Sequence, residues 1–141
     1  MKRSSWILAM FFCACVMSCS NNDDNNPTPS INPDAPTTGT WRVTLFTDSG
    51  KDETSDFSGY TFTFDSNGTA VATKSGTSKN GSWSASSSSK KFNLNFGIKS
   101  DANKPLGELT DDWEIISLSA TEIKLKDDND DSGEYLTFNQ N

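Results

Sequence analysis

The sequence predicts an all-β fold: a small antiparallel up-and-down β-barrel of eight short strands, preceded by a leader and a linker. After residue 38, apolar and polar residues alternate in short runs, as in half-buried strands. Turns rich in Gly, Ser and Asn separate most of these runs, and no stretch after Cys19 has helical spacing. A meander of this kind removes its exposed edges by closing into a barrel.

The first 18 residues read as a cleaved signal peptide. Lys2 and Arg3 form a basic start, and the apolar or small residues that follow are too few to span a bilayer, which needs about 20. The run ends in Val16-Met17-Ser18-Cys19, which resembles the lipobox of bacterial lipoproteins. The resemblance implies a diacylglycerol on the Cys19 sulfur, cleavage before Cys19, and acylation of the new amine with a fatty acid such as palmitate. The alternative is a leader that merely contains cysteines.

Residues 19–38 are expected to form a flexible Asn- and Pro-rich linker, because Ile31 is their one large apolar residue. Two or three acyl chains at Cys19 anchor a protein stably to a membrane. Asp23 and Asp24 follow closely, and this acidic segment resembles the export signal of Bacteroidetes lipoproteins. We therefore expect anchoring at the outer membrane, with exposure at the cell surface. A merely solvated tether is the alternative.

Charge and reactive groups exclude several functions. Removing Lys2 and Arg3 with the leader takes the net charge from −7 to −9, and without a basic stripe nucleic acid is not an expected partner. The chain has no histidine, and Cys13 and Cys15 belong to the leader. Residues 39–141 therefore offer no thiol, imidazole, disulfide or Cys/His zinc site, which removes most hydrolase mechanisms.

The strands follow in order after residue 38. Trp41, Val43 and Leu45 alternate with polar neighbours, so we expect all three to face inward. The change of phase between Ile115 and Ile116 predicts a β-bulge. Turns are expected at residues 65–68, where Asn-Gly favours positive φ, and at 75–81. The predicted strands cover residues 41–45, 60–64, 69–74, 82–84, 92–96, 113–118, 123–126 and 135–138.

Several short motifs resemble a known family. Gly39-Thr40-Trp41 looks like the Gly-x-Trp opening of lipocalins, and the whole of residues 39–141 is similar to small lipocalin-like lipoproteins of the Bacteroidetes. The resemblance rests also on Tyr60-Thr61-Phe62-Thr63-Phe64, Gly81-Ser82-Trp83, Trp113-Glu114-Ile115 and Leu136-Thr137-Phe138. It implies binding of a small molecule or partner without catalysis. Lipocalins also place a late arginine against the opening tryptophan, whereas here Arg42 is the one arginine after the leader.

Six aromatic residues are candidates to line a pocket for an apolar or ring-bearing ligand. The alternative is that a barrel of this size needs their rings to fill itself, with Trp41 plugging the base. The six are Trp41, Tyr60, Phe62, Trp83, Phe92 and Trp113.

An acidic loop suggests a cation site. Asp128, Asp130, Ser132 and Glu134, with Gly133 between the last two, resemble the start of a calcium loop. Asn139 stands where an EF-hand needs its bidentate glutamate, and the flanks are strands, so an EF-hand is excluded. We expect no cofactor, and a solvated hairpin loop is the alternative to a calcium site.

Two further patterns are not expected to be catalytic. Ser87 and Lys90 fit Ser-x-x-Lys, but they lie on a turn and not on a helix. Asp111 and Asp112 point to opposite faces of a strand, which prevents shared acid–base work. We predict a monomeric, non-enzymatic, lipid-anchored protein that holds a small hydrophobic or amphipathic ligand in the barrel mouth. The alternative is a module that binds or inhibits an extracellular protein through surface loops of a filled barrel.

Overall fold

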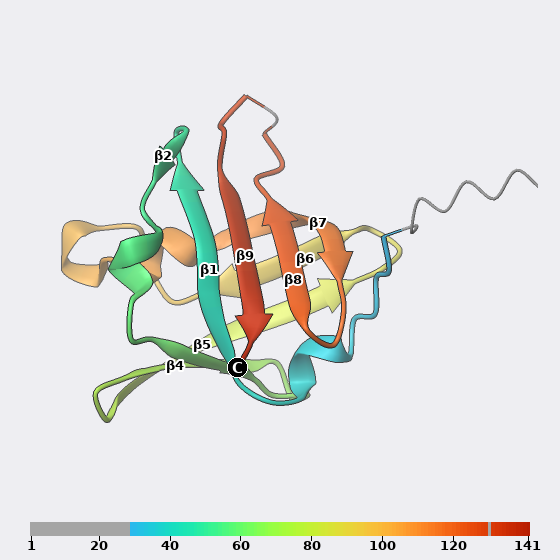
Figure 1. Cartoon of the computed structure of the whole chain (residues 1–141), viewed down its shortest axis with the longest axis horizontal. Coiled ribbons are helices and arrows are strands. Elements are labelled where there is room, and N and C mark those ends of the chain that lie inside the picture. Colours follow the sequence, from blue (N-terminus) through green and yellow to red (C-terminus); the bar gives the residue numbers. More distant parts are fainter. Residues whose placement is uncertain (1–28, 130) are drawn as a thin grey trace, which may run out of the picture.

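The computed structural model describes residues 29–129 and 131–141 and shows a closed antiparallel β-barrel (Figure 1). Neighbouring strands follow one another along the chain, and β1 also pairs with β9, which closes the sheet. β2 pairs only with the end of β1, so eight strands form the wall, and the predicted barrel is confirmed. The strands are β1 (Trp41–Asp48), β2 (Lys51–Asp52), β3 (Thr61–Phe64), β4 (Thr69–Lys74), β5 (Thr77–Ser86), β6 (Lys91–Asn95), β7 (Asp111–Leu118), β8 (Glu122–Lys126) and β9 (Tyr135–Gln140).

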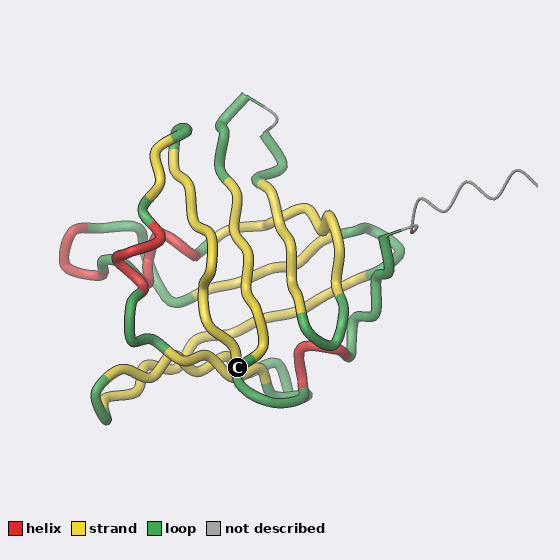
Figure 2. The backbone as a smooth tube through the Cα atoms, in the orientation of Figure 1, coloured by secondary structure: helices red, strands yellow, loops and turns green. Residues whose placement is uncertain are grey.

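Short 3₁₀ helices cover the two ends of the barrel. They are η1 (Ala35–Thr37), η2 (Thr54–Phe57), η3 (Asp101–Asn103) and η4 (Leu106–Leu109). Figure 2 shows η1 alone at the lower right, whereas η2, η3 and η4 gather at the left. We call the η1 end the base and the opposite end the mouth. No helix within the described residues has the length and apolar character needed to cross a membrane.

The barrel interior is a continuous apolar core rich in aromatic rings. Phe64 makes edge-on contacts with Trp83, Phe92 and Phe138, with ring centroids 5.5 to 5.8 Å apart. This is the favoured arrangement of aromatic pairs, and it adds to the stabilisation from burial. At the mouth, the buried side chains of Phe57, of Leu106 and of Leu109 cover the core. The barrel is therefore filled along its axis and capped at the mouth.

The predicted bulge in β7 is confirmed. Ile115 pairs with Leu125, and the next pair is Ser117 with Lys124, so Ile116 is the extra residue. Side chains alternate between the two faces of a strand, so one extra residue shifts which of the following side chains face inward. Ile116 is consequently exposed, whereas Leu118 is fully buried.

A second bulge, in β1, overturns the expected orientation of Leu45. The register shifts between Val43 and Leu45 in the pairing with β9, which makes Thr44 the extra residue. Leu45 then points outward with 37% of its surface exposed, and Phe46 is fully buried instead. The sequence does not reveal this bulge, because Leu45 and Phe46 are both large apolar residues that could face the core.

The ordered structure begins before residue 39, so the linker prediction is wrong for residues 30–38. Ile31 forms a parallel bridge with Leu118 and packs against the core. In η1, Ala35 and Pro36 are buried, and the indole of Trp41 donates a hydrogen bond to the Pro36 carbonyl (3.0 Å). These residues close the base of the barrel. The predicted signal peptide, Cys19 and the rest of the linker up to residue 28 lie outside the described residues.

The turn between β4 and β5 is shorter than predicted. It consists of Ser75 and Gly76, both with positive φ, and β5 starts at Thr77 instead of residue 82. The first half of β5 is polar, so it carries no hydrophobic alternation that reveals a strand. Its pairing with β4 places Lys79 directly opposite the buried Ala72.

Candidate functional site

Most of the predicted aromatic site is barrel core. Trp41, Phe62, Phe92 and Trp113 are completely buried, and Trp83 is nearly so. These rings fill the barrel, which is the alternative that the sequence left open. Of the six candidates, Tyr60 alone is half-buried and lies beside a cleft at the mouth.

The three tryptophans also use their polar atom within the chain. Each indole N–H donates to a main-chain carbonyl of a neighbouring turn or helix, which leaves it without a free donor for a ligand. The rings therefore hold η1, the β3–β4 turn and η4 against the wall. The bonds join Trp41 to Pro36 (3.0 Å), Trp83 to Asp65 (2.9 Å) and Trp113 to Leu109 (3.0 Å).

The best candidate site is a cleft of about 480 Å³ at the mouth, which we call the mouth cleft. It lies between the β4–β5 hairpin tip and the η3–η4 segment, with Tyr60 of the η2–β3 connection at its side. Its volume falls in the range of small-molecule sites. Its lining residues are Tyr60, Ala72, Lys74, Ser75, Thr77, Lys79, Ala102, Asn103, Lys104 and Leu106.

The mouth cleft combines apolar surface with positive charge. Ala72 and Leu106 are buried residues of the core that reach its lining. Lys74, Lys79 and Lys104 also line it, and no acidic residue does. Sequence reasoning missed the lysines, because Lys79 lies in a polar stretch that was expected to be a turn, and Lys104 comes from the distant connection between β6 and β7. The one available signal was that Lys74 continues the inward alternation of Ala70 and Ala72.

Other clefts on the surface are less suited to a ligand. One of about 370 Å³ lies over β5, β6 and the start of β7, and its lining includes the predicted site residue Trp83 and the carboxylates of Asp111 and Asp112. Another, of about 490 Å³, lies near the junction of β1 and β3, where Trp41 and Phe62 are the one register pair. Both also reach buried apolar residues, but the first has no basic residue in its lining and the second has Arg42 alone, whereas three lysines line the mouth cleft.

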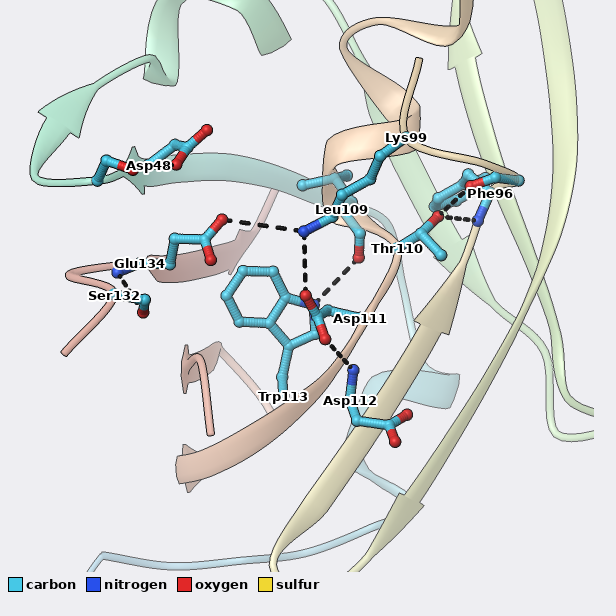
Figure 3. Close-up of polar contacts among 12 residues, drawn as sticks. Asp48, Phe96, Lys99, Leu109, Thr110, Asp111, Asp112, Trp113, Ser132 and Glu134 are labelled. Carbon is cyan, nitrogen blue, oxygen red and sulfur yellow. Dashed lines mark hydrogen bonds and ion pairs between the residues drawn. The ribbon is translucent and has the colours of Figure 1, made fainter. Parts of the chain in front are cut away.

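A second polar cluster joins Lys99 to Asp111 and Glu134 (Figure 3). The Lys99 amine lies between two carboxylates, 3.0 Å from Asp111 Oδ2 and 4.0 Å from Glu134 Oε1. Carboxylate oxygens of Asp111, Asp127 and Glu134 come within 4.8 Å of one another. The sequence did not predict this grouping, because Asp111 was considered only with its neighbour Asp112.

Burial and internal contacts shift the pKa values of three members of this cluster. Partial burial raises the pKa of Glu134. Burial also acts to raise the pKa of Asp127, but hydrogen bonds from Ser132 and the local main chain outweigh it and leave that pKa lowered. Burial opposes the charge of Lys99 as well, yet its hydrogen bond to Asp111 leaves the pKa of Lys99 raised. Lys99 thus stays charged and ties the 97–110 connection to the β8–β9 loop.

Comparison with known proteins identifies the family. The family model of the lipocalin-like domain matches residues 37–125, more than half of the chain. The chain belongs to the lipocalin-like domain family. A crystal structure of a DUF4847 family protein from Bacteroides vulgatus ATCC 8482 is similar, with a TM-score of 0.55 and 17% sequence identity. The match covers 75% of this chain and 94% of that chain, and it supports the fold alone. No curated protein matches.

Within the described residues of this lipocalin-like domain, Arg42 is the one arginine, and a glutamine contacts the segment before the opening tryptophan. Gln140 of β9 pairs directly with Trp41, and its side-chain amide donates to the Thr38 carbonyl (2.9 Å). The Gln140 side chain lies so close to Gly39 that a β-carbon there would clash with it. Arg42 instead reaches the C-terminus and donates to Asn141 Oδ1 (3.0 Å).

Two of the described residues of the suggested calcium loop are directed to different lysines. Asp128 pairs with Lys91 of β6 at 2.7 Å, whereas Glu134 lies near Lys99. The Ser132 hydroxyl accepts a hydrogen bond from the Glu134 amide. Asp130 lies outside the described residues.

The other two patterns lie where the sequence placed them. Ser87 and Lys90 belong to the exposed turn between β5 and β6. Asp111 and Asp112 are successive residues of β7, and Asp112 is the more exposed of the two. Neither pattern is assembled into a nucleophile–base pair.

Proposed function

We propose that this chain is a non-enzymatic, lipid-anchored binding protein of the cell envelope that holds a small hydrophobic or amphipathic molecule in the mouth cleft. The observation that supports the proposal best is the combination of an apolar floor and polar rim in a cleft of about 480 Å³. Because aromatic rings fill the barrel below, the ligand lies at the rim and not along the axis.

Binding is tested by native mass spectrometry of the full chain after exposure to a membrane extract. We expect a retained mass of a few hundred daltons, in keeping with the volume of the cleft. Ala102→Trp fills the cleft from an exposed position and should abolish the added mass. Ala120→Trp is the control, since it places the same ring on the exposed β7–β8 turn at the base. An added mass that survives in Ala102→Trp contradicts the assignment of the cleft.

The membrane anchor is supported by the lipobox-like sequence that ends at Cys19. We propose acylation of Cys19, cleavage of residues 1–18 and attachment to the outer membrane with exposure at the surface. Metabolic labelling with palmitate should mark the wild-type chain and leave Cys19→Ser unlabelled. Protease treatment of intact cells then reports whether the domain faces outward. Equal labelling of both chains contradicts the proposal.

We further propose that the protein acts as a monomer and needs no cofactor. A calcium site in the acidic loop is the alternative, and it predicts a higher melting temperature in millimolar calcium than in chelator. We expect equal melting temperatures, because Asp128 and Glu134 are directed to different lysines.

A role in binding another protein is the second candidate. The filled barrel favours it, as does Ile98, which lies on the connection after β6 with 79% of its surface exposed. In that case Ile98→Asp should release a co-purifying partner, whereas Ala102→Trp should retain it. The opposite pattern supports ligand capture in the mouth cleft.

A further inference from the structure

We propose that the molecule held in the mouth cleft is an anionic amphiphile, whose carboxylate or phosphate group is bound by Lys74 and Lys79 while its apolar part lies on Ala72 and Leu106. This inference rests on the proposed function, and it names the chemical class of the ligand.

The charge of the mouth cleft contrasts with that of the whole chain. The chain has 19 acidic and 12 basic residues, yet three lysines and no acid line the cleft. Lys104 is compensated outside the lining by Glu108 at 3.0 Å and by Asp101 at 3.9 Å. Within the described part of the chain, neither Lys74 nor Lys79 forms an ion pair with a carboxylate. The cleft thus holds two uncompensated cations in an acidic protein.

Register brings these two cations together on the inward face. Ala72 pairs directly with Lys79, and Lys74 pairs with Thr77, so the two lysines are diagonal neighbours across β4 and β5. Diagonal neighbours on one face of a sheet lie about 7–8 Å apart, within reach of long side chains. Like charges this close repel each other in the absence of a counter-charge. An anion between them removes the repulsion and gains two charge-assisted hydrogen bonds.

Both ammonium groups are also held in position. The Lys74 amine lies 4.7 Å from the centre of the Tyr60 ring, a cation–π arrangement. Lys79 donates to the side-chain oxygen of Asn103, and the Asn103 amide donates in turn to the main-chain oxygens of Phe96 and Ile98. Because an ammonium carries three donors, each lysine keeps donors for a ligand. Such preorganisation reduces the entropy lost on binding.

The apolar lining defines the rest of the ligand. Ala72 and Leu106 are buried at the cleft floor, and Tyr60 presents a half-buried ring beside Lys74. A short alkyl chain or ring on this floor keeps its charged end at the lysines. An inorganic anion would leave the floor unused, and a neutral lipid would leave the cations unpaired.

The test compares ligands that share one tail and differ in charge. The full chain is titrated calorimetrically with octanoate, octyl phosphate, octanol and octylamine, and with inorganic phosphate as the free anion. The detergent or nanodisc that carries the protein, titrated alone, supplies the baseline. We expect octanoate and octyl phosphate to bind roughly tenfold more tightly than octanol, as for two partly exposed ion pairs. Octylamine and inorganic phosphate should bind more weakly than octanoate and octyl phosphate. Added salt should reduce the difference in affinity between octanoate and octanol.

Two pairs of substitutions localise the effect. Lys74→Gln with Lys79→Gln should bring octanoate affinity down to that of octanol, and Lys74→Arg with Lys79→Arg should preserve the difference. Lys90→Gln with Lys124→Gln removes the same charge from the base turn and the outer wall, and should leave octanoate binding unchanged. Far-ultraviolet circular dichroism and melting confirm that each variant is folded.

The remaining outcomes separate the two proposals. If octanol binds as tightly as octanoate, or if the base and outer-wall variant loses as much affinity as the cleft variant, the anionic ligand is wrong and the proposed function stands. If inorganic phosphate binds as tightly as octyl phosphate, the site takes a free anion and the amphiphile is wrong. If no octyl compound binds and Ala102→Trp leaves the mass retained from membrane extract unchanged, the proposed function fails as well.

Discussion

At the scale of single residues, Gly81 decides how closely two strands pack. A β-carbon on Gly81 would clash with the main-chain oxygen of Asn95 and would lie 2.7 Å from the Phe96 ring. The Phe96 ring is buried within the core. The glycine is thus required by space and not by a left-handed backbone.

We predict that Gly81→Ala lowers the free energy of unfolding by about 1–3 kcal/mol, because the added methyl group overpacks the contact with β6. Urea unfolding measures the change. The neighbouring exposed Ser82→Ala is the control, with an expected effect within about 0.5 kcal/mol. Equal stability of wild type and Gly81→Ala would show that β6 can move away freely.

Glu134 is a residue whose ionisation opposes folding. Burial raises its pKa, and the carboxylates of Asp48, Asp127 and Asp111 act in the same direction, whereas Lys99 lowers it. The folded state therefore binds a proton more readily than the unfolded state. The stabilisation that Glu134 contributes to folding is fully present below the pKa that it has in the unfolded chain. It is lost as the pH rises through the higher pKa that it has in the folded state.

We predict that Glu134→Gln gains stability relative to wild type as the pH rises from about 4 to 7, since glutamine cannot ionise. Urea unfolding at several pH values measures the difference. Asp127→Asn should show the opposite pH dependence, because the pKa of Asp127 is lowered in the folded state. Wild type should be more stable than this variant at neutral pH, and this difference in unfolding free energy should be lost as the pH falls below about 4. A difference between wild type and Glu134→Gln that does not vary with pH would contradict the prediction.

At the scale of elements, the bulge in β1 determines which side chain caps the core at the mouth. Phe46 is buried after the bulge, and its ring contacts that of Phe57 in η2 with centroids 5.1 Å apart. Leu45 lies on the outer face. The extra residue in β1 thus turns Phe46 inward, where it packs against the helix η2 that covers the mouth.

The bulge makes the two neighbours respond differently to truncation. Phe46→Ala should cost about 3–5 kcal/mol of unfolding free energy, because it leaves a cavity in the core. Leu45→Ala should cost less than about 1 kcal/mol, as expected for a side chain on the outer face of the barrel. Chemical unfolding of both variants measures this. A larger loss of unfolding free energy in Leu45→Ala than in Phe46→Ala would show that Leu45 faces the core, and it would rule out the bulge.

At the scale of the whole molecule, the barrel is closed at both ends by segments outside its wall. Residues 30–38 cover the base, where the Asn32 amide donates to the Leu118 carbonyl (3.0 Å) and the Leu118 amide to the Ser30 carbonyl (2.8 Å). At the mouth, η2 and η4 place buried side chains over the core. The folded unit is therefore longer than the run of strands.

We predict that a chain of residues 39–141 is less stable than one of residues 29–141 by at least about 2 kcal/mol, because Trp41 loses its acceptor and Ile31 and Ala35 no longer cover the base. Guanidinium unfolding of the two chains measures the difference. Identical midpoints and slopes would show that residues 29–38 contribute nothing to the fold.

The candidate site was only partly predictable. Tyr60 was found from its place in an alternating aromatic run, and the barrel mouth was expected as the location. The lysines of the mouth cleft were not found, because Lys79 lies in a polar stretch that looks like a turn and faces inward only through its pairing with Ala72. The grouping of Asp111 with Asp127 and Glu134 likewise depends on strands that are adjacent in space and not in sequence.

The alternation of apolar and polar residues was enough to predict eight strands, most turns and the closed barrel, because a period of two residues sorts side chains between core and solvent without knowledge of the neighbours. It also showed that residues 39–141 carry no thiol or imidazole. The tertiary structure decided the β1 bulge, the packing of residues 30–38 on the base and the convergence of Lys74 and Lys79. These features depend on register and on contacts between distant segments, and a local pattern records neither.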